Sequence, residues 1–257
     1  IQNFTGNTKI DSITFKNCTF QGNTSKMEDN TFAAVKMGAD SQYFENVTVT
    51  GCTISDYFQG VYVQGVDSLT VTNCSIDNTT HNAIAVQSGN NSEVKGDIVI
   101  TENVIQNAND RAIRFGEASE VDAVTVNNNI ILNSGDSAGE LIKAGTLPED
   151  MSSFSLEHNY WDGKTPEEAV ADNNLPVPTT TGVTGGTFSG LEDIAAYCAA
   201  GYVPTKNEDG SFTVAYDDSG VFANGSGTAD DPYQIAYETQ LAAFRDAVNA
   251  GQTYAGQ

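Results

Sequence analysis

Three cysteines stand at the same place in three copies of a short sequence unit. Each copy reads apolar, polar, polar or Gly, Cys, any residue, apolar, and the cysteines are Cys18, Cys52 and Cys74. Thiols in such a row could bind a metal, form one disulfide, or lie buried as small apolar side chains. Zinc sites use short paired spacings such as Cys-x2-Cys, which this sequence lacks. The pattern therefore favours three buried thiols, with one disulfide as the alternative and no metal site.

Basic residues are scarce, yet several fall on one repeated strand motif. The chain has 11 Lys+Arg against 34 Asp+Glu, a net charge of −23. Aromatic residues and arginine are common in sites that bind sugars or proteins. The outward positions of this strand and the loops before it give the candidate ligand-binding set Lys36, Tyr57, Phe58, Tyr62, His81, Arg111, Arg114 and Lys143. The competing interpretation is a solvated sheet face whose charges aid solubility.

The cysteine unit continues along the chain with asparagine in the special position. Six clear copies and a weaker seventh have, in order, the special residues Cys18, Cys52, Cys74, Asn103, Asn129, Asn159 and Gly186. Apolar and polar residues alternate up to that position, as in a strand with one buried face. The unit is constant while the connections vary in length, which is typical of stacked coils with loops of free length.

A second strand motif follows each of the first five units. Its copies begin at Ala34, Gly60, Ala83, Ala112 and Leu141. The strands of one coil cannot bury an apolar face alone, whereas stacked coils bury a continuous column. Hairpin turn signals between adjacent strands are missing, which argues against a β-sandwich. We therefore predict an all-β fold with a single-stranded solenoid of about seven coils over residues 1–188.

These motifs resemble the right-handed parallel β-helices of the pectate-lyase-like superfamily, over residues 11 to 188. The inward asparagine ladder of that family corresponds to Asn103, Asn129 and Asn159, and the cysteines occupy the same column in a departure from the family pattern. The stretch 159–163 (Asn-Tyr-Trp-Asp-Gly) is also similar to a late-coil motif of the superfamily. The resemblance implies that the second strand and the loop before it correspond to the polysaccharide groove of the catalytic members.

An enzyme would need a convergent set of acids and bases on that groove. The nearest approach, and the candidate catalytic set if the protein is an enzyme, is Asp110, Arg111, Arg114 and Glu117. The resemblance implies acidic calcium ligands beside a basic residue for a lyase, and a glycosidase needs carboxylates that converge on the scissile bond. No calcium-site motif accompanies the four residues, so the sequence favours a non-catalytic protein. Polysaccharide lyase or glycoside hydrolase activity is the alternative.

The C-terminal third predicts a cap, a hairpin and part of a further module. A capping box at Thr165–Glu168 begins one short helix, and Ser189–Glu192 begins another that runs to about Ala200 and closes the end of the coil stack. The turn signal at 207–210, flanked by apolar residues, predicts a hairpin, so residues 189–216 form a capping helix and hairpin. The stretch from Val183 to Val214 resembles a module of large bacterial surface proteins.

Residues 217–257 are predicted to be an acidic linker and the truncated start of another surface module. An amphipathic helix is expected from about Glu238 to Asn249, with Leu241, Phe244 and Val248 on its apolar face. The acidic pairs 217–218 and 230–231 predict either a surface calcium site or a solvated acidic linker, and no other cofactor is expected.

Composition narrows the class of function. So acidic a chain lacks the cationic surface that nucleic-acid binding needs. No apolar run reaches the roughly 18 residues of a membrane-spanning helix, so no membrane insertion is expected in this segment. Abundant Asn, Thr, Ser and Gly with little Lys suit an extracellular β-rich protein. Together with the resemblance, this predicts a stalk or adhesin segment on the bacterial cell surface, with a glycan or a host surface protein as the partner.

Overall fold

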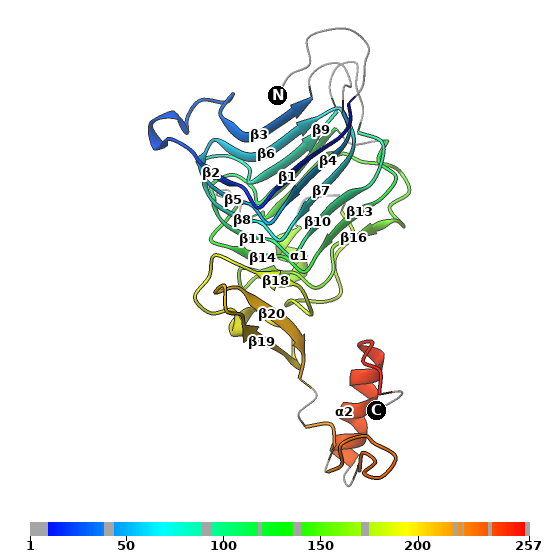
Figure 1. Ribbon diagram of the computed structural model, residues 1–257. Coiled ribbons are helices and arrows are strands. Elements are labelled where there is room, and N and C mark those ends of the chain that lie inside the picture. The colour runs from blue at the N-terminus through cyan, green and yellow to red at the C-terminus, as the bar shows by residue number, and fades with distance from the viewer. Residues whose placement is uncertain are drawn as a thin grey trace.

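The computed structural model describes residues 10–38, 44–88, 94–117, 120–135, 140–170, 175–217, 220–222, 224–235 and 238–254. A stack of parallel strands forms the body of the molecule, a small antiparallel sheet lies beside the later coils, and helix α2 lies beyond that sheet (Figure 1). The stack is a parallel β-helix, as the repeat pattern predicts.

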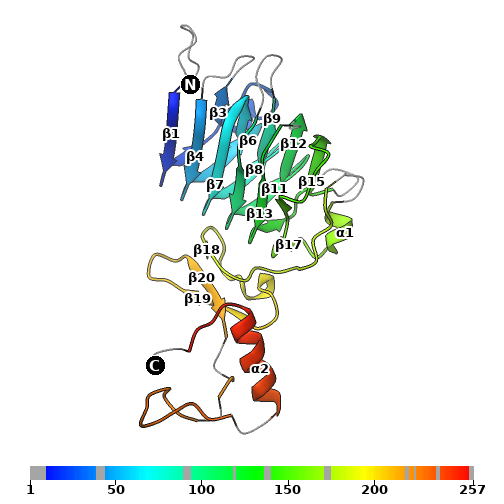
Figure 2. The same ribbon diagram turned by 90° about the vertical axis from the view of Figure 1, so that its right-hand side faces the viewer.

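Three parallel sheets run along the stack. Sheet A contains β1 (Ile10–Lys16), β4 (Phe44–Thr50), β7 (Val66–Thr72), β10 (Ile98–Thr101), β13 (Val124–Asn127) and β16 (Phe154–Ser155). Sheet B contains β2 (Thr19–Gln21), β5 (Thr53–Tyr57), β8 (Ser75–Thr79), β11 (Val104–Ala108), β14 (Ile130–Leu132) and β17 (Tyr160–Trp161). Sheet C contains β3 (Ala33–Gly38), β6 (Gln59–Gln64), β9 (Ile84–Gln87), β12 (Ile113–Glu117) and β15 (Ile142–Thr146). Each of the first five coils passes once through the three sheets, so that neighbouring coils pair strand for strand (Figure 2).

Alternation along each strand fills the core. In β7, Leu69 and Val71 are fully buried, whereas the alternate residues Thr70 and Thr72 are half-buried. Their neighbours in register, such as Ile98 and Ile100 of β10, are fully buried too. Apolar side chains therefore stack in continuous columns, and this burial is the main favourable term that holds the coils together.

The corners between sheets require left-handed backbone. The residue just before the ladder position has a positive φ in every coil; the values include 53° at Asn73, 54° at Asn128 and 61° at Gly51. Asn and Gly tolerate this conformation better than other residues. This explains why the repeated unit prefers a polar residue or Gly immediately before Cys or Asn.

Among the described residues the solenoid has six coils rather than about seven. The sixth coil contains β16 and β17, and helix α1 (Pro166–Ala169) stands in place of its third strand. The N–H of Leu141 donates to the carbonyl of Ala169 at 3.2 Å, and Ala169, Val170 and Leu175 join the main core. The α1 segment, begun by the predicted Thr165–Glu168 capping box, therefore covers the end of the stack.

The expected seventh unit leaves the solenoid. Its strand β18 (Thr187–Phe188) pairs antiparallel with β20 (Phe212–Tyr216), which also pairs with β19 (Tyr202–Lys206). The helix expected from residue 189 is absent from the described chain, which has a 3₁₀ turn, η2 (Ala195–Tyr197), instead. We refer to residues 183–216 as the side module.

The side module packs on the flank of the solenoid rather than on its end. Phe188, Ile194 and Phe212 form a second core with Val104 and Ile130, which face outward from sheet B. The N–H of Thr184 donates to Oδ1 of Asn128 at 2.9 Å. Coils four and five carry apolar residues on their outer face here, and the side module covers these residues. Helix α1, and not the side module, covers the end of the stack.

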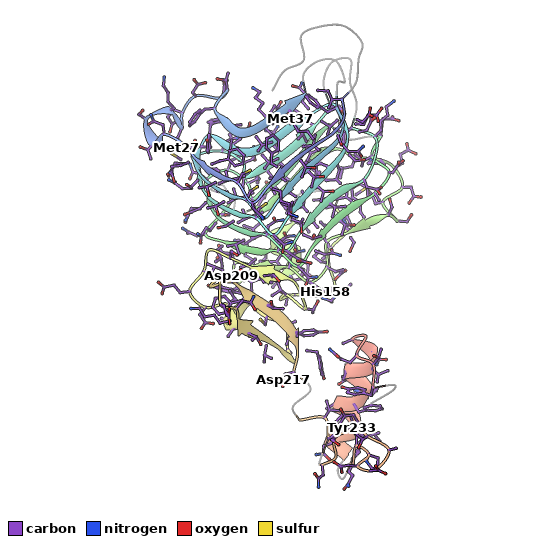
Figure 3. The ribbon with its side chains drawn as sticks, viewed as in Figure 1. Met27, Met37, His158, Asp209, Asp217 and Tyr233 are labelled. Atoms are coloured by element: carbon purple, nitrogen blue, oxygen red, sulfur yellow. The ribbon has the colours of Figure 1, made fainter. Side chains whose placement is uncertain are left out.

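Helix α2 (Glu238–Asn249) belongs to a small C-terminal unit. Figure 3 labels Asp217 where the chain leaves the side module and Tyr233 within this unit. The rings of Phe222 and Tyr233 stack at 4.0 Å, and Phe244 and Tyr254 pack around Phe222. Only part of the expected apolar face is covered, since Leu241 is 57% exposed and Val248 46% exposed.

Candidate functional site

An asparagine ladder lies buried at the corner between sheets A and B. The Oδ1 of Asn159 accepts the backbone N–H of Asn129 at 2.8 Å, and Oδ1 of Asn129 accepts that of Asn103 at 3.1 Å. Each Nδ2 donates to a carbonyl of the preceding coil, as Asn129 does to Ile100 at 2.8 Å. All three side chains are fully buried. The ladder therefore satisfies backbone groups that the tight corner leaves without strand partners.

The cysteines continue this ladder with weaker bonds. The N–H of Cys74 donates to Oδ1 of Asn103 at 2.9 Å, and the N–H of Cys52 donates to Sγ of Cys74 at 3.5 Å. The Cys74 thiol donates to the carbonyl of Val49 at 3.5 Å, the same contact that an asparagine Nδ2 makes in later coils. Cys18, Cys52, Cys74 and also Cys198 are free thiols in this structure. The column has a structural role, with sulfur as a poor donor and acceptor.

Alkaline pH should destabilise the protein through Cys74. Burial raises the pKa of the Cys74 thiol from 9.0 to about 12. A folded-state pKa above the unfolded value means that the thiol's contribution is full below pH 9 and is lost as the pH rises toward 12. We expect a loss on the order of 4 kcal/mol across that window. Urea unfolding from about pH 8 to pH 11.5 measures this loss of stability. The unfolding free energy of Cys74→Ala should depend clearly less on pH. An equal pH dependence in the variant would show that Cys74 is not the cause.

The outward face of sheet C carries the predicted cationic column. Lys36 pairs in register with Tyr62, and Ala85 pairs with Tyr62 on one side and Arg114 on the other. Arg114 in turn pairs with Lys143. Strand alternation directs these side chains outward, because Ile113 and Phe115 on either side of Arg114 are fully buried. The Nζ of Lys36 lies 5.4 Å from the centre of the Tyr62 ring.

An open hollow of 450 Å³ adjoins this column at the later coils. Gly116 and Gly145 occupy the next outward position of their strands, where a Cβ at Gly145 would lie 2.4 Å from the carbonyl oxygen of Gly116. Arg114 and Lys143 border the space on one side, and Gln64 and Gln87 border it on the other. The complete lining is Gln64, Gln87, Ser88, Arg114, Phe115, Gly116, Lys143, Ala144, Gly145 and Thr146. We call this space the sheet C hollow; it offers two cations and two amides to a ligand.

Arg111 does not lie on the binding face where it was expected. It is 2% exposed, and its Nη1 lies 2.6 Å from Oδ1 of Asp110 while its Nη2 lies 2.5 Å from Oε2 of Glu140. Glu140 is 7% exposed, and its Oε2 also lies 3.8 Å from Nζ of Lys143. A buried cation between two carboxylates holds the B-to-C corners of successive coils together, so Arg111 has a structural role.

The other predicted ligand-binding residues lie at the corner that precedes sheet C. Phe58 stacks on His81 with ring centres 4.8 Å apart, and Tyr57 packs against Phe32 at 4.7 Å. The Nε2 of His81 lies 3.2 Å from Oδ2 of Asp110. Burial lowers the pKa of His81, and the carboxylate of Asp110 partly offsets this effect. These half-buried rings border the sheet C face where its strands begin.

Of the candidate catalytic residues, Asp110 and Arg111 form one ion pair and Arg114 lies on the outward face of sheet C. Asp110 and Glu140 both face Arg111, whereas Arg114 points outward and has no ion-pair partner among the described residues. The side chain of Glu117 lies outside the described part of the structure. No carboxylate lines the sheet C hollow among the residues that the structure describes.

Of the acidic pairs near the C-terminus, the structure describes Asp217, Asp230 and Asp231. Oδ2 of Asp231 accepts the N–H of Ser226 at 2.9 Å and so braces its own loop. Asp218 lies outside the described residues. Within the described ranges, no group of three or more His, Cys, Asp or Glu is placed to hold a metal ion.

A family model for the right-handed β-helix region matches residues 2–159. This chain belongs to the right-handed β-helix family. The match ends at Asn159, the last residue of the ladder, which agrees with a solenoid that stops in the sixth coil. No curated protein and no solved structure matched the chain. No helix within the described residues is both long and apolar enough to cross a membrane.

A second ladder at the exposed corner between sheets B and C was not foreseen. Nδ2 of Asn78 donates to Oδ1 of Asp56, and Nδ2 of Asn133 donates to Oδ1 of Asn107, both at 2.6 Å. All four have positive φ, between 47° and 65°. The signal was present in the sequence, because residues that tolerate left-handed backbone recur four positions after each ladder residue. They are Gly22, Asp56, Asn78, Asn107, Asn133 and Gly163.

Proposed function

We propose that this right-handed β-helix is a non-catalytic segment of a bacterial cell-surface protein, a stalk or adhesin that binds a glycan through the sheet C hollow. The observation that carries the proposal is the outward Arg114, which has no ion-pair partner among the described residues and lies beside Lys143, Gln64 and Gln87. Guanidinium, ammonium and amide groups on a rigid sheet are suited to the hydroxyl and acidic groups of sugars. The rings of Phe58 and Tyr57, at the corner before sheet C, extend this candidate binding face toward the earlier coils.

The acidic remainder of the chain supports placement outside the cell. A net charge of −23 keeps a long projecting rod soluble and discourages self-association. It also leaves attraction for an acidic ligand to the few cations, such as Arg114 and Lys143. Host surface proteins with sulfated or sialylated glycans would present the same chemistry, so they belong in the same screen.

A glycan-array screen of the chain tests the proposal. We expect at least one class of glycan to be retained and Arg114→Ala to weaken it by about tenfold, since a charge-assisted hydrogen bond is lost. Arg245→Ala is the matched control, because Arg245 is an exposed arginine on α2 outside the hollow. The proposal fails if no glycan binds, or if the two arginine variants bind equally well.

A further inference from the structure

One segment of the side module lies along the corner between sheets A and B and contacts successive coils. The N–H of Thr184 donates to Oδ1 of Asn128, in the fifth coil, at 2.9 Å. In the amide orientation that satisfies both of its ends, Nδ2 of Asn73, in the third coil, donates to the carbonyl of Thr187 at 3.0 Å. Outward asparagines at this corner therefore hold the backbone of a segment that runs along the solenoid axis.

The spacing of these two contacts follows from strand geometry. From Thr184 to Thr187 the chain advances three residues, which cover about 10 Å at about 3.3 Å per residue. From the fifth coil to the third there are two steps of about 4.8 Å, which also cover about 10 Å. Three residues of an extended segment thus match two coils. At the same two-coil spacing, the next outward asparagine after Asn128 and Asn73 is Asn17 in the first coil.

The segment covers the later coils and leaves the first two open. Asn73 and Asn128 are half-buried beside it, whereas Asn17 and Gly51 of the first two coils are exposed. The chain turns away from the corner at Gly190, where φ is +88°. The corner positions of the first two coils therefore repeat the pattern of the occupied ones and remain accessible.

A polar hollow of 460 Å³ lies at this open part of the corner, within the size range of ligand pockets, about 300–1,000 Å³. The solenoid lines one side of it, and β18 and the tip of the β19–β20 hairpin line the other. The lining includes Asn17, Gly51 and Thr53 from the solenoid and Thr187, Ser189 and Asp209 from the side module, with Asp209 labelled in Figure 3. The hollow thus continues the line of the bound segment toward the first coil.

The flank beside the hollow is polar. The outward position after the ladder holds Val104 and Ile130 in the fourth and fifth coils, where Phe188 packs on them. The same position holds Thr19 and Thr53 in the first two coils, and both are exposed. A guest in the hollow would therefore gain from small hydroxyl-bearing side chains rather than from an apolar one.

The second coil also has more room than the fourth. A Cβ added to Gly186 would lie 2.6 Å from Cγ of Glu102, so the fourth coil accepts only glycine above it. The equivalent residue of the second coil is Gly51, which has no side chain to collide with a guest. A residue with a side chain can therefore lie over the second coil.

Among the described residues that line the hollow, Asp209 is the charged one. The hydroxyl and the N–H of Ser211 donate to its Oδ1 at 2.6 and 2.9 Å, and these bonds lower the pKa of the Asp209 carboxyl. The carboxylate is exposed and attracts a basic group. A second copy of this chain carries the same net charge of −23 and is repelled at long range, so a basic segment of another protein is the better guest.

We infer that the hollow at the A-to-B corner of the first two coils binds an extended peptide segment of another protein. The guest carries small Ser, Thr or Gly side chains toward the solenoid and one Lys or Arg opposite Asp209. The amide of Asn17 holds its backbone as Asn73 and Asn128 hold residues 184–187. This inference does not depend on the sheet C hollow.

The test maps backbone amide shifts by NMR in the intact chain. The probe is the blocked peptide Ser-Thr-Lys-Thr-Ser, and the comparison peptide has Glu in place of Lys. Each is added at about 5 mM, which fills most of a site with a Kd of about 1 mM. We expect the Lys peptide to shift resonances of residues 17 and 50–53, with no effect of Arg114→Ala on these shifts. The Glu peptide should bind several-fold more weakly.

Three variants separate binding from folding. Asn17→Gly removes the amide, tolerates the same left-handed backbone, and should weaken binding by about tenfold with little change in Tm. Asn78→Gly is the matched control, because Asn78 is also exposed and has the same φ of 53° at the other corner, and it should bind as the parent does. Asp209→Asn keeps an acceptor for Ser211 and should weaken binding several-fold and flatten its salt dependence.

Four results would overturn the inference. The Lys peptide shifts no resonance of residues 17 and 50–53, or Asn17→Gly binds it as well as Asn78→Gly does. The Glu peptide binds as tightly as the Lys peptide. The same resonances shift with protein concentration in the absence of peptide, which would assign the hollow to a second copy of this chain.

Discussion

Replacement of Asn129 by alanine is expected to lower the free energy of unfolding by about 4 kcal/mol. Asn129 accepts the backbone N–H of Asn103 and donates to the carbonyl of Ile100, and both partners are in the fully buried corner of the solenoid. Alanine leaves these groups buried with no replacement, and each such loss costs about 1 to 3 kcal/mol. Water cannot reach the site to compensate. Urea unfolding followed by far-UV circular dichroism measures the change.

Asn109→Ala is the matched control for this experiment. It deletes the same amide from an exposed corner of the neighbouring coil, where the side chain makes no bond to a described residue. Its effect should stay within about 0.5 kcal/mol. Hydrogen exchange should also show that Asn129→Ala loses protection first in the coils of Asn103 and Asn159, because coils contact only their neighbours. Equal stability of the two alanine variants would mean that the ladder does not support the fold.

Arg111→Met should destabilise the protein by about 3 to 5 kcal/mol. The substitution keeps an unbranched, flexible stem but removes the guanidinium cation between Asp110 and Glu140. Glu140 would then be a buried carboxylate with only Lys143, 3.8 Å away, to offset its charge. In other proteins, removing one partner of a buried ion pair lowers the stability by about 3 to 5 kcal/mol. Thermal and urea unfolding at pH 7 provide the measurement.

Two further variants decide whether the buried pair is the cause. Arg245→Met breaks an exposed pair with Asp246, whose side chains are 66% and 52% exposed, and should cost less than about 1 kcal/mol. The double variant Arg111→Met with Glu140→Met removes both charges and should regain most of the lost stability. If Arg111→Met is no worse than Arg245→Met, or if the double variant is the less stable one, the buried network does not stabilise this corner.

The solenoid was predictable because its signals repeat. One alternating unit with a special residue defined the strands of sheets A and B, and the second motif defined sheet C and its outward column from Lys36 to Lys143. The capping box at Thr165, the hairpin around 207–210 and helix α2 depend on local residues, so they too could be predicted.

Long-range packing was harder to predict. The residues around Ser189 give no indication that this segment packs on Val104 and Ile130. Alternation alone would place those two side chains in solvent. Similarly, Arg111 lies just before β12 and Arg114 lies within it, and both are arginines in the sequence. The register of the coils places Glu140 against Arg111, which is buried. The exposed ladder could have been found, since its residues recur at a fixed offset, but that offset lies beyond the six-residue unit.

Glycan retention and glycan cleavage measured on the same sample test the central claim most directly. The chain is incubated with immobilised glycans that it retains and with polyuronates, and released reducing ends are quantified alongside bound protein. The account predicts retention that Arg114→Ala weakens and no release of sugar by either protein. Reproducible release of reducing ends that is lost on Arg114→Ala would contradict it and would identify the sheet C hollow as an active site.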